Sequence, residues 1–355
     1  MRRILVTGAG GAAAANFVHS LRLAPEPFHV VGTDTSEFHL ELAPVDARYL
    51  LPRADDPAYL DELNAVVERE GIELVHPQPE QEVLVLARER DQVRAATFLP
   101  RPETVETCQD KAAFAARMAD ASLPAPRFAR PKDEDSLREA TASILEGREQ
   151  AWVRAVRGAG ARASLPVSSP DQAVAWVRYW LERRGLGFGD FMVSEFLPGR
   201  EFAFQSVWHE GRLVTSAARE RLEYVFGHLM PSGQSSSPSV ARTVRREDVN
   251  DLAAGAVQAV DPEATGVFCV DLKEDESGQP LVTEINAGRF FTTSNFLAEA
   301  GANMPYTYVR LALGQSLNGL PRFDAVEPGL YWVRMIDMGY KLVREGEWRS
   351  TRVDR

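Results

Sequence analysis

Three side chains that carry oxygen donors fall close together late in the chain. Asp271 and Glu284 are 13 positions apart, and the polar, turn-forming residues 275–279 separate two apolar runs. This pattern predicts an antiparallel hairpin that brings the two acids onto paired strands. Asn286 follows Glu284 by two positions and therefore projects from the same face. Because Mg²⁺ prefers oxygen ligands, the sequence predicts a metal site at these three residues rather than a solvent-facing polar strand.

A second segment combines a strand, a Pro-Gly turn and a carboxylate. Residues 191–201 read as a strand, the turn Pro198-Gly199, and a second strand that begins at Glu201. Main-chain groups around Phe196 and Leu197 could meet the edge of an adenine, and Glu201 could accept hydrogen bonds from ribose hydroxyls. A plain hairpin with exposed acids is the alternative.

A glycine-containing loop follows a strand that ends in a cation. Arg154 closes the apolar run that begins at Trp152, and Gly158 and Gly160 come shortly after it. Such a hairpin could fold over a triphosphate. An ordinary surface turn with solvated arginines explains the same residues.

The N-terminus offers a competing chemistry. Gly8, Gly10 and Gly11 lie between a predicted strand and a predicted helix, where backbone N–H groups can hold an anion, and Asp34 ends the next strand. These features are typical of NAD(P)-dependent oxidoreductases or epimerases of the short-chain type. Against that hypothesis, Ala14 stands where the third glycine is expected, and the sequence has no Tyr-x-x-x-Lys pair. A tight turn that needs small residues for packing is an equally good interpretation.

The order of these motifs resembles the ATP-grasp superfamily, nearest to carbamoyl-phosphate synthetase large-subunit-like and pyrrolysine-biosynthesis-type ligases, over roughly residues 1–315. Relatives often have lysine where Arg154 stands, and Asn-Pro-Arg where this chain has residues 286–289. The resemblance implies metal ligands at Asp271, Glu284 and Asn286, and catalytic roles for Arg154 and Arg289. It implies the following ATP-binding residues: Lys111, Arg154, Gly158, Gly160, Glu195, Phe196, Leu197, Glu201 and His228.

Substrate contacts are expected outside the ATP motifs. Gln78 and Glu82 follow the predicted strand Leu74–His76, and loops after parallel strands commonly bind ligands. Capping of the next helix is the alternative for both. Arg289 is a third candidate. The polar run Thr292–Asn295 fits either a helix start or a substrate contact.

The elements that must position these residues divide into distinct regions. Apolar runs alternate with amphipathic segments over the first hundred residues, which predicts a doubly wound parallel sheet. Together with the resemblance, this pattern implies the fold class: an α/β N-terminal doubly wound parallel-sheet domain followed by a two-lobed α+β ATP-grasp module. The expected bounds are an N-terminal domain at 1–108, a small lobe at 109–190, a large lobe with the metal site at 191–320, and a C-terminal extension at 321–355.

Composition narrows the function classes. The net charge of −11 disfavours nucleic acid and anionic membranes as partners. The two cysteines lack metal-ligand spacing, and no stretch approaches about 20 apolar residues, so we expect the protein in the cytoplasm. A homo-oligomer is compatible with the sequence.

The resulting hypothesis is a ligase that uses ATP and Mg²⁺, with Mn²⁺ as an alternative ion. It would activate a small-molecule carboxylate as an acyl phosphate and transfer it to an amine or related nucleophile, releasing ADP and phosphate. The oxidoreductase and a non-catalytic ATP-binding protein are the competing hypotheses.

Overall fold

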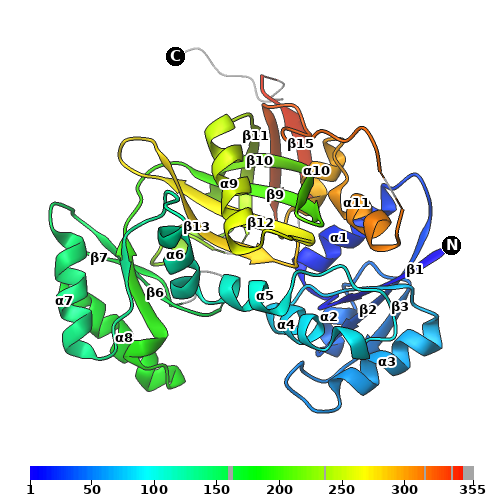
Figure 1. Cartoon of the computed structure of the whole chain (residues 1–355), viewed down its shortest axis with the longest axis horizontal. Coiled ribbons are helices and arrows are strands. Elements are labelled where there is room, and N and C mark those ends of the chain that lie inside the picture. Colours follow the sequence, from blue (N-terminus) through cyan, green and yellow to red (C-terminus); the bar gives the residue numbers. More distant parts are fainter. Residues whose placement is uncertain (159–162, 236, 316, 337–338, 347–355) are drawn as a thin grey trace.

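The computed structural model describes residues 1–158, 163–235, 237–315, 317–336 and 339–346 (Figure 1). Three β-sheets organise the chain. Two are four-stranded and one is seven-stranded. None of the helices in the described ranges is long and apolar enough to cross a membrane.

The N-terminal domain is a parallel sheet with strand order β3-β2-β1-β4. Its strands are β1 (Arg2–Thr7), β2 (Phe28–Asp34), β3 (Ala47–Leu50) and β4 (Leu74–His76), and its helices are α1 (Ala12–Arg22), α2 (Glu37–Leu40), α3 (Tyr59–Glu70) and α4 (Glu80–Arg88). The side chains of alternate residues of β1 pack in two different hydrophobic cores, one on each face of the sheet. Ile4 and Val6 pack with α1, whereas Leu5 packs with α3 and α4. Both faces of the sheet are therefore covered, which confirms the doubly wound prediction.

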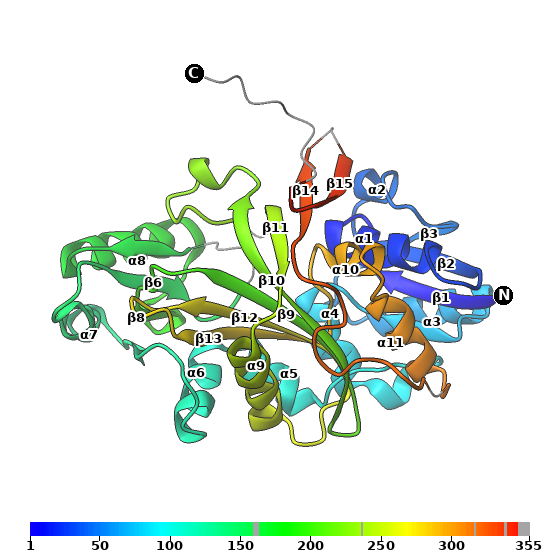
Figure 2. The same cartoon turned by 90° about the horizontal axis from the view of Figure 1, so that it is seen from above.

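The small lobe is an antiparallel sheet with order β5-β8-β6-β7, covered by two helices (Figure 2). Its elements are β5 (Phe128–Ala129), β6 (Ala151–Ala155), α7 (Glu134–Leu145), β7 (Leu165–Val167), α8 (Pro170–Arg184) and β8 (Phe191–Glu195). The strand β8 pairs with both β5 and β6. The expected boundary at residue 190 would assign β8 to the large lobe, although β8 pairs with strands of the small lobe. Strand pairing therefore extends the small lobe to Glu195.

The large lobe is built on the seven-stranded sheet, with order β13-β12-β9-β10-β11-β14-β15. Its strands are β9 (Glu201–His209), β10 (Arg212–Tyr224), β11 (Pro238–Val244), β12 (Gly266–Glu274), β13 (Pro280–Ala287), β14 (Leu330–Met335) and β15 (Gly339–Arg344). The segment expected as an extension thus contributes strands to this sheet, and Trp332 of β14 is buried against Phe296.

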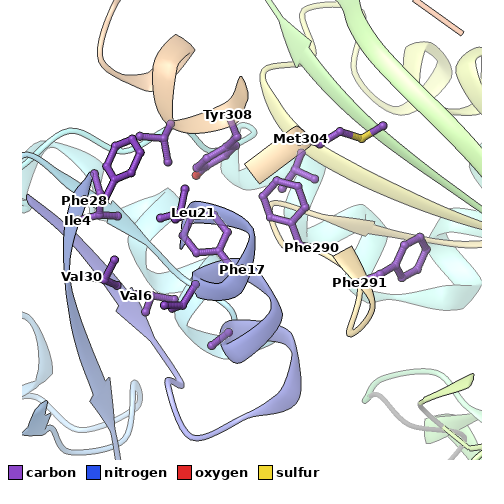
Figure 3. Packing of buried hydrophobic residues seen from close by; sticks show 14 of the residues in the cluster. Ile4, Val6, Phe17, Leu21, Phe28, Val30, Phe290, Phe291, Met304 and Tyr308 are labelled. Carbon is purple, nitrogen blue, oxygen red and sulfur yellow. The ribbon is translucent and has the colours of Figure 1, made fainter. Parts of the chain in front are cut away.

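Helices cover the two faces of the large sheet. The helices α5 (Pro102–Gln109), α6 (Lys111–Asp120) and α9 (Glu247–Val260) lie against one face (Figure 1). The helices α10 (Ser294–Glu299) and α11 (Met304–Ala312) lie on the other and also contact α1. Figure 3 shows this shared core, in which Phe17 of α1 lies beside Phe290, and the ring of Tyr308 meets that of Phe17 edge-on. The N-terminal domain and the large lobe therefore share one hydrophobic core.

The glycine-rich turn between β1 and α1 is closely packed. A Cβ added to Gly10 would lie 2.3 Å from the Cβ of His39 and 2.7 Å from its backbone carbonyl. Gly8 has φ of +59°, and a Cβ there would lie 2.6 Å from the ring of Pro79. Both positions therefore require glycine for packing.

We expect Gly10→Ala to destabilise the protein by about 1–3 kcal/mol, because the added methyl group meets backbone atoms that cannot move freely. Urea unfolding followed by circular dichroism measures the change. Gly189→Ala is the matched control, since a Cβ there meets nothing within 4 Å. Equal unfolding midpoints for the two variants would contradict the packing argument.

Candidate functional site

Two carboxylates face each other across the β12–β13 pair. Asp271 and Glu284 are direct partners in the strand register, and Asn286 donates from Nδ2 to Oδ2 of Asp271 over 3.3 Å. All three side chains line a cavity of about 250 Å³. The spacing argument from the sequence therefore predicted the hairpin and its shared face correctly.

Cations from outside the β12–β13 hairpin converge on Glu284. Nζ of Lys111 lies 3.8 Å from its Oε2, and Nη1 of Arg154 lies 3.6 Å from the same oxygen. Asp110 caps the helix that begins at Lys111 by accepting hydrogen bonds from two backbone N–H groups, which fixes the lysine at the helix start. Arg289 donates to Oδ1 of Asn286. Several positive charges thus surround one end of the cavity.

The environments of the two carboxylates differ. Burial raises the pKa of Asp271 to about 7, although Arg221 opposes this shift. Burial would also raise the pKa of Glu284, but Lys111, Arg154 and Arg289 outweigh it and lower that pKa to about 2. Glu284 is therefore held as a carboxylate, whereas Asp271 is the costlier of the two groups to keep charged.

The donor set of this region suits a hard cation. Among the described residues, no group of three or more histidine, cysteine, aspartate or glutamate side chains could hold a metal by itself. Asp271, Glu284 and Asn286 supply two carboxylates and an amide oxygen. This is the oxygen chemistry that Mg²⁺ accepts when ligand oxygens fill its remaining positions.

The opposite end of the cavity combines apolar side chains with one carboxylate. Glu201 accepts a 2.7 Å hydrogen bond from Nζ of Lys273, and further hydrogen bonds from Tyr224 and Gln234. Lys273 and Arg221 flank Glu201 in the strand register of β12, β9 and β10. Burial would raise the pKa of Glu201, but Lys273, together with Tyr224 and Arg221, outweighs it and lowers that pKa. The apolar lining of this end comprises Pro126, Trp152, Phe196, Leu197 and Leu272.

Glu195 also reaches the cavity, but arginines of the small lobe already engage it. Nε of Arg127 lies 2.5 Å and Nη2 of Arg148 lies 2.7 Å from Oε1 of Glu195. Its side chain therefore helps to hold the small lobe together at the cavity rim.

Most of the residues predicted from sequence line this one cavity. They are Lys111, Arg154, Gly158, Glu195, Phe196, Leu197, Glu201, Asp271, Glu284, Asn286 and Arg289. Gly160 lies outside the described residues.

Three predicted residues do not line the cavity. Glu82 is buried in the N-terminal domain and accepts a 2.8 Å hydrogen bond from Tyr59. Gln78 is buried beside His76, with 3.1 Å between their side-chain nitrogens. His228 is exposed on the short 3₁₀ turn Gly227–Leu229. The proposed ligand contacts of Gln78, Glu82 and His228 thus gain no support from the geometry, because local packing or solvent accounts for each side chain.

The polar residues of the cavity that sequence reasoning missed include four with charged, amide or phenol groups, namely Arg221, Tyr224, Gln234 and Lys273. Lys273 follows Asp271 by two positions, so the alternation of a strand could have identified it. The other three come from β10 and the segment after it, and their approach depends on long-range strand pairing.

Three backbone N–H groups of the N-terminal glycine turn are already used within the domain. The N–H groups of Ala9, Gly10 and Gly11 donate to the carbonyl of Thr33, the carboxylate of Asp34 and the carbonyl of Gly8, respectively. Dinucleotide binding requires such N–H groups to face the pyrophosphate. The turn is therefore used for packing within its domain.

Two family models match separate parts of the chain. One, described as "PylC-like, N-terminal domain", matches residues 4–99. The other, described as "ATP-grasp in the biosynthetic pathway with Ter operon", matches residues 187–330 and thus includes Asp271 and Glu284.

Solved structures with the same fold cover nearly the whole chain. The L-amino acid ligase from Bacillus licheniformis is 17% identical with a TM-score of 0.67, over 94% of this chain and 79% of that one. The biotin carboxylase domain of 2-oxoglutarate carboxylase from Hydrogenobacter thermophilus, in complex with MgADP, ADP and bicarbonate, is 15% identical with a TM-score of 0.70, over 93% and 73%. N5-carboxyaminoimidazole synthetase from Staphylococcus aureus, complexed with ADP, is 15% identical with a TM-score of 0.68, over 94% and 82%.

Arg221 and Asp271 form a mostly buried pair, with 2.5 Å between Nη2 and Oδ1. We expect Arg221→Met to lower the free energy of unfolding by about 3 kcal/mol, because Asp271 loses its nearest cation in a buried position. Chemical denaturation measures the loss.

A double-mutant cycle with Asp271→Asn provides the control. The double variant should be clearly more stable than the sum of the two single effects predicts, because the amide needs no cation. Simple additivity would show that the pair contributes no coupling.

Proposed function

We propose that this chain, which carries an ATP-grasp domain behind a PylC-like N-terminal domain, is an ATP-dependent ligase that forms a carbon–nitrogen bond. It would activate a carboxylate as an acyl phosphate, transfer it to an amine or related nucleophile, and release ADP and phosphate. One observation carries the proposal: a single cavity joins an apolar, carboxylate-bearing end to an end with opposed acids and clustered cations.

The division of the cavity suits a nucleoside triphosphate. Trp152, Phe196 and Leu197 offer apolar contacts for an adenine, and Glu201 offers acceptors for ribose hydroxyls. Lys111 and Arg154 then lie toward the phosphates. In this orientation the terminal phosphate reaches the region of Asp271 and Glu284.

Mg²⁺ fits the oxygen donors of Asp271, Glu284 and Asn286. When bound, the ion would shield negative charge on the phosphates. Binding requires Arg289 to give up its hydrogen bond to Oδ1 of Asn286. Arg289 is then available to neutralise charge on the group being transferred.

Cationic side chains of the protein would lower the electrostatic barrier to the reaction. A carboxylate and a terminal phosphate repel each other, so the site must neutralise charge and hold the reactants in line. Lys111, Arg154 and Arg289 supply fixed positive charges within the cavity. Removing one such group typically costs on the order of 3 kcal/mol of transition-state stabilisation. No covalent enzyme nucleophile is needed.

The competing hypotheses fit the site less well. An oxidoreductase would use backbone donors of the glycine turn, and those of Ala9, Gly10 and Gly11 already bond within the domain. A non-catalytic ATP-binding protein would share the cavity, so turnover is the property that separates it from a ligase.

We expect the purified protein, given ATP, Mg²⁺, hydroxylamine and fractions of a metabolite extract, to release ADP and form a hydroxamate with at least one fraction. Hydroxylamine traps an acyl phosphate, so coupled detection of ADP and hydroxamate reports activation directly. Glu284→Gln should reduce the rate by roughly a hundredfold or more, because it weakens the site for the metal.

The matched control is Glu276→Gln, in the exposed turn between the same two strands, which should retain the wild-type rate. Release of AMP in place of ADP would contradict acyl phosphate formation. ATP binding without any turnover would favour the non-catalytic alternative.

We expect ADP to bind more tightly than 2′-deoxy-ADP, and Glu201→Gln to bind ADP roughly tenfold or more weakly, because hydrogen bonds from ribose to a charged acceptor are lost. Calorimetric titration measures both. The variant should discriminate poorly between the two nucleotides. Tight binding of NADH without binding of ADP would contradict the ligase proposal and favour the oxidoreductase hypothesis.

A further inference from the structure

Arg219 of β10 is a buried cation that forms no ion pair with an acid of the described residues. Its side chain is 1% exposed, and its Nε and Nη1 have no hydrogen-bond partner among the described residues. Its guanidinium carbon lies 4.9 Å from the centre of the Phe291 ring. This cation–π contact is a weak substitute for a counter-ion at a buried position.

The strand register places Arg219 in line with the opposed carboxylates. Arg219 pairs with Ala203 of β9, Ala203 pairs with Asp271, and Asp271 pairs with Glu284. Side chains at paired positions project from one face, so these four form a single row across the sheet. Arg219 and Asp271 are two strand spacings apart, about 9.5 Å. The methyl group of Ala203 is the only side chain between them in this row.

Phe291 lies over this row and lines the cavity. Its ring contacts Arg219 and is 5.1 Å from the guanidinium carbon of Arg221. The neighbouring Phe290 packs with Phe17, and Phe291 belongs to the same hydrophobic cluster (Figure 3). Phe291 therefore separates Arg219 from the open part of the cavity.

The surrounding charges leave Arg219 unneutralised. Arg221 bonds to Asp271, and Arg334 bonds to the carbonyls of Thr292 and Pro238. Burial, and after it the charge of Arg221, lower the pKa of Arg219, although the more distant Asp271 acts in the opposite direction. Thr293, in the segment that carries Phe291, has a buried hydroxyl without a partner among the described residues.

We propose that Arg219 binds an anionic group of a substrate, a carboxylate or a phosphate, in the space above Ala203 that the Phe291 ring now covers. Arginine suits both groups because its planar fork donates paired hydrogen bonds. Lys111 and Arg154 already stand beside Glu284, where the reacting carboxylate would meet the phosphate. Arg219 is therefore available to an anionic group that does not react.

The identification of the ligand as a substrate rests on the proposed function, but anion binding at Arg219 does not. The test uses malonate and, separately, inorganic phosphate as probes. Protein saturated with ADP and Mg²⁺ is unfolded thermally at constant ionic strength. We expect at least one anion to raise the midpoint by about 3 °C or more in the wild type and by less than about 1 °C in Arg219→Met. The more effective anion distinguishes a carboxylate from a phosphate.

Arg212→Met is the matched control, because Arg212 lies on the same strand but is exposed. It should respond to the anions like the wild type. Equal shifts in the wild type and Arg219→Met, or no shift in the wild type, overturn the proposal. Failure of ADP to bind in a separate titration would instead count against the proposed function.

Two further measurements separate binding from a structural role. Without anions, Arg219→Met should unfold at or above the wild-type temperature, because it removes a buried, uncompensated charge. A clearly lower midpoint would mean that Arg219 mainly supports packing, and would overturn the proposal. Phe291→Leu keeps Arg219 and removes the ring, so it should bind the effective anion roughly threefold to tenfold more tightly. If Phe291→Leu binds the anion more weakly than the wild type, or equally well, the Phe291 ring does not cover the anion site and this part of the proposal is wrong.

Discussion

The direct opposition of Asp271 and Glu284 is the constraint on which the rest of the site depends. Like charges at paired positions of neighbouring strands destabilise a sheet unless cations offset them. Here the cations come from separate elements: Lys111 from the start of α6, Arg154 from β6 of the small lobe, and Arg221 from β10. The small lobe is thereby drawn toward the edge of the large sheet. The cavity is the space that this convergence encloses.

The N-terminal domain completes the cavity through packing rather than through its glycine turn. Its helix α1 shares a hydrophobic core with α10 and α11, and its Glu80 lies 3.8 Å from Nη2 of Arg289. The segment from Phe290 to Thr292 runs between this core and the cavity. The side of the cavity that faces a substrate is therefore formed where two domains meet. This explains why the strand ends of the N-terminal sheet contribute less to the cavity than the sequence suggested.

Local sequence patterns predicted the parts of the site that lie within one hairpin. Alternation and a short turn were enough to group Asp271 with Glu284 and to place Glu201 at the start of a strand. The sequence did not predict Arg221 as a site residue, because its position depends on pairing between β9, β10 and β12. No local sequence pattern reveals that pairing. The same limitation explains β14, which was expected in a C-terminal extension and pairs with β11, far from it in the sequence. The pairing that decides such cases involves residues far apart in the sequence.

The row of side chains from Glu284 to Arg219 has opposite charges at its two ends. One end holds two carboxylates suited to a cation, the middle is buried at Ala203 in the apolar cluster that includes Phe291, and the other end holds a cation without an acidic partner among the described residues. A buried charge of this kind costs stability, and an apolar side chain of similar size would often be more favourable. A ligand that supplies the missing negative charge would explain why Arg219 is present at this position. A ligand bound along the row must then point its reacting group toward β13 and a second anionic group toward β10. The order of strands in the sheet therefore constrains the shape of a ligand that fits this row.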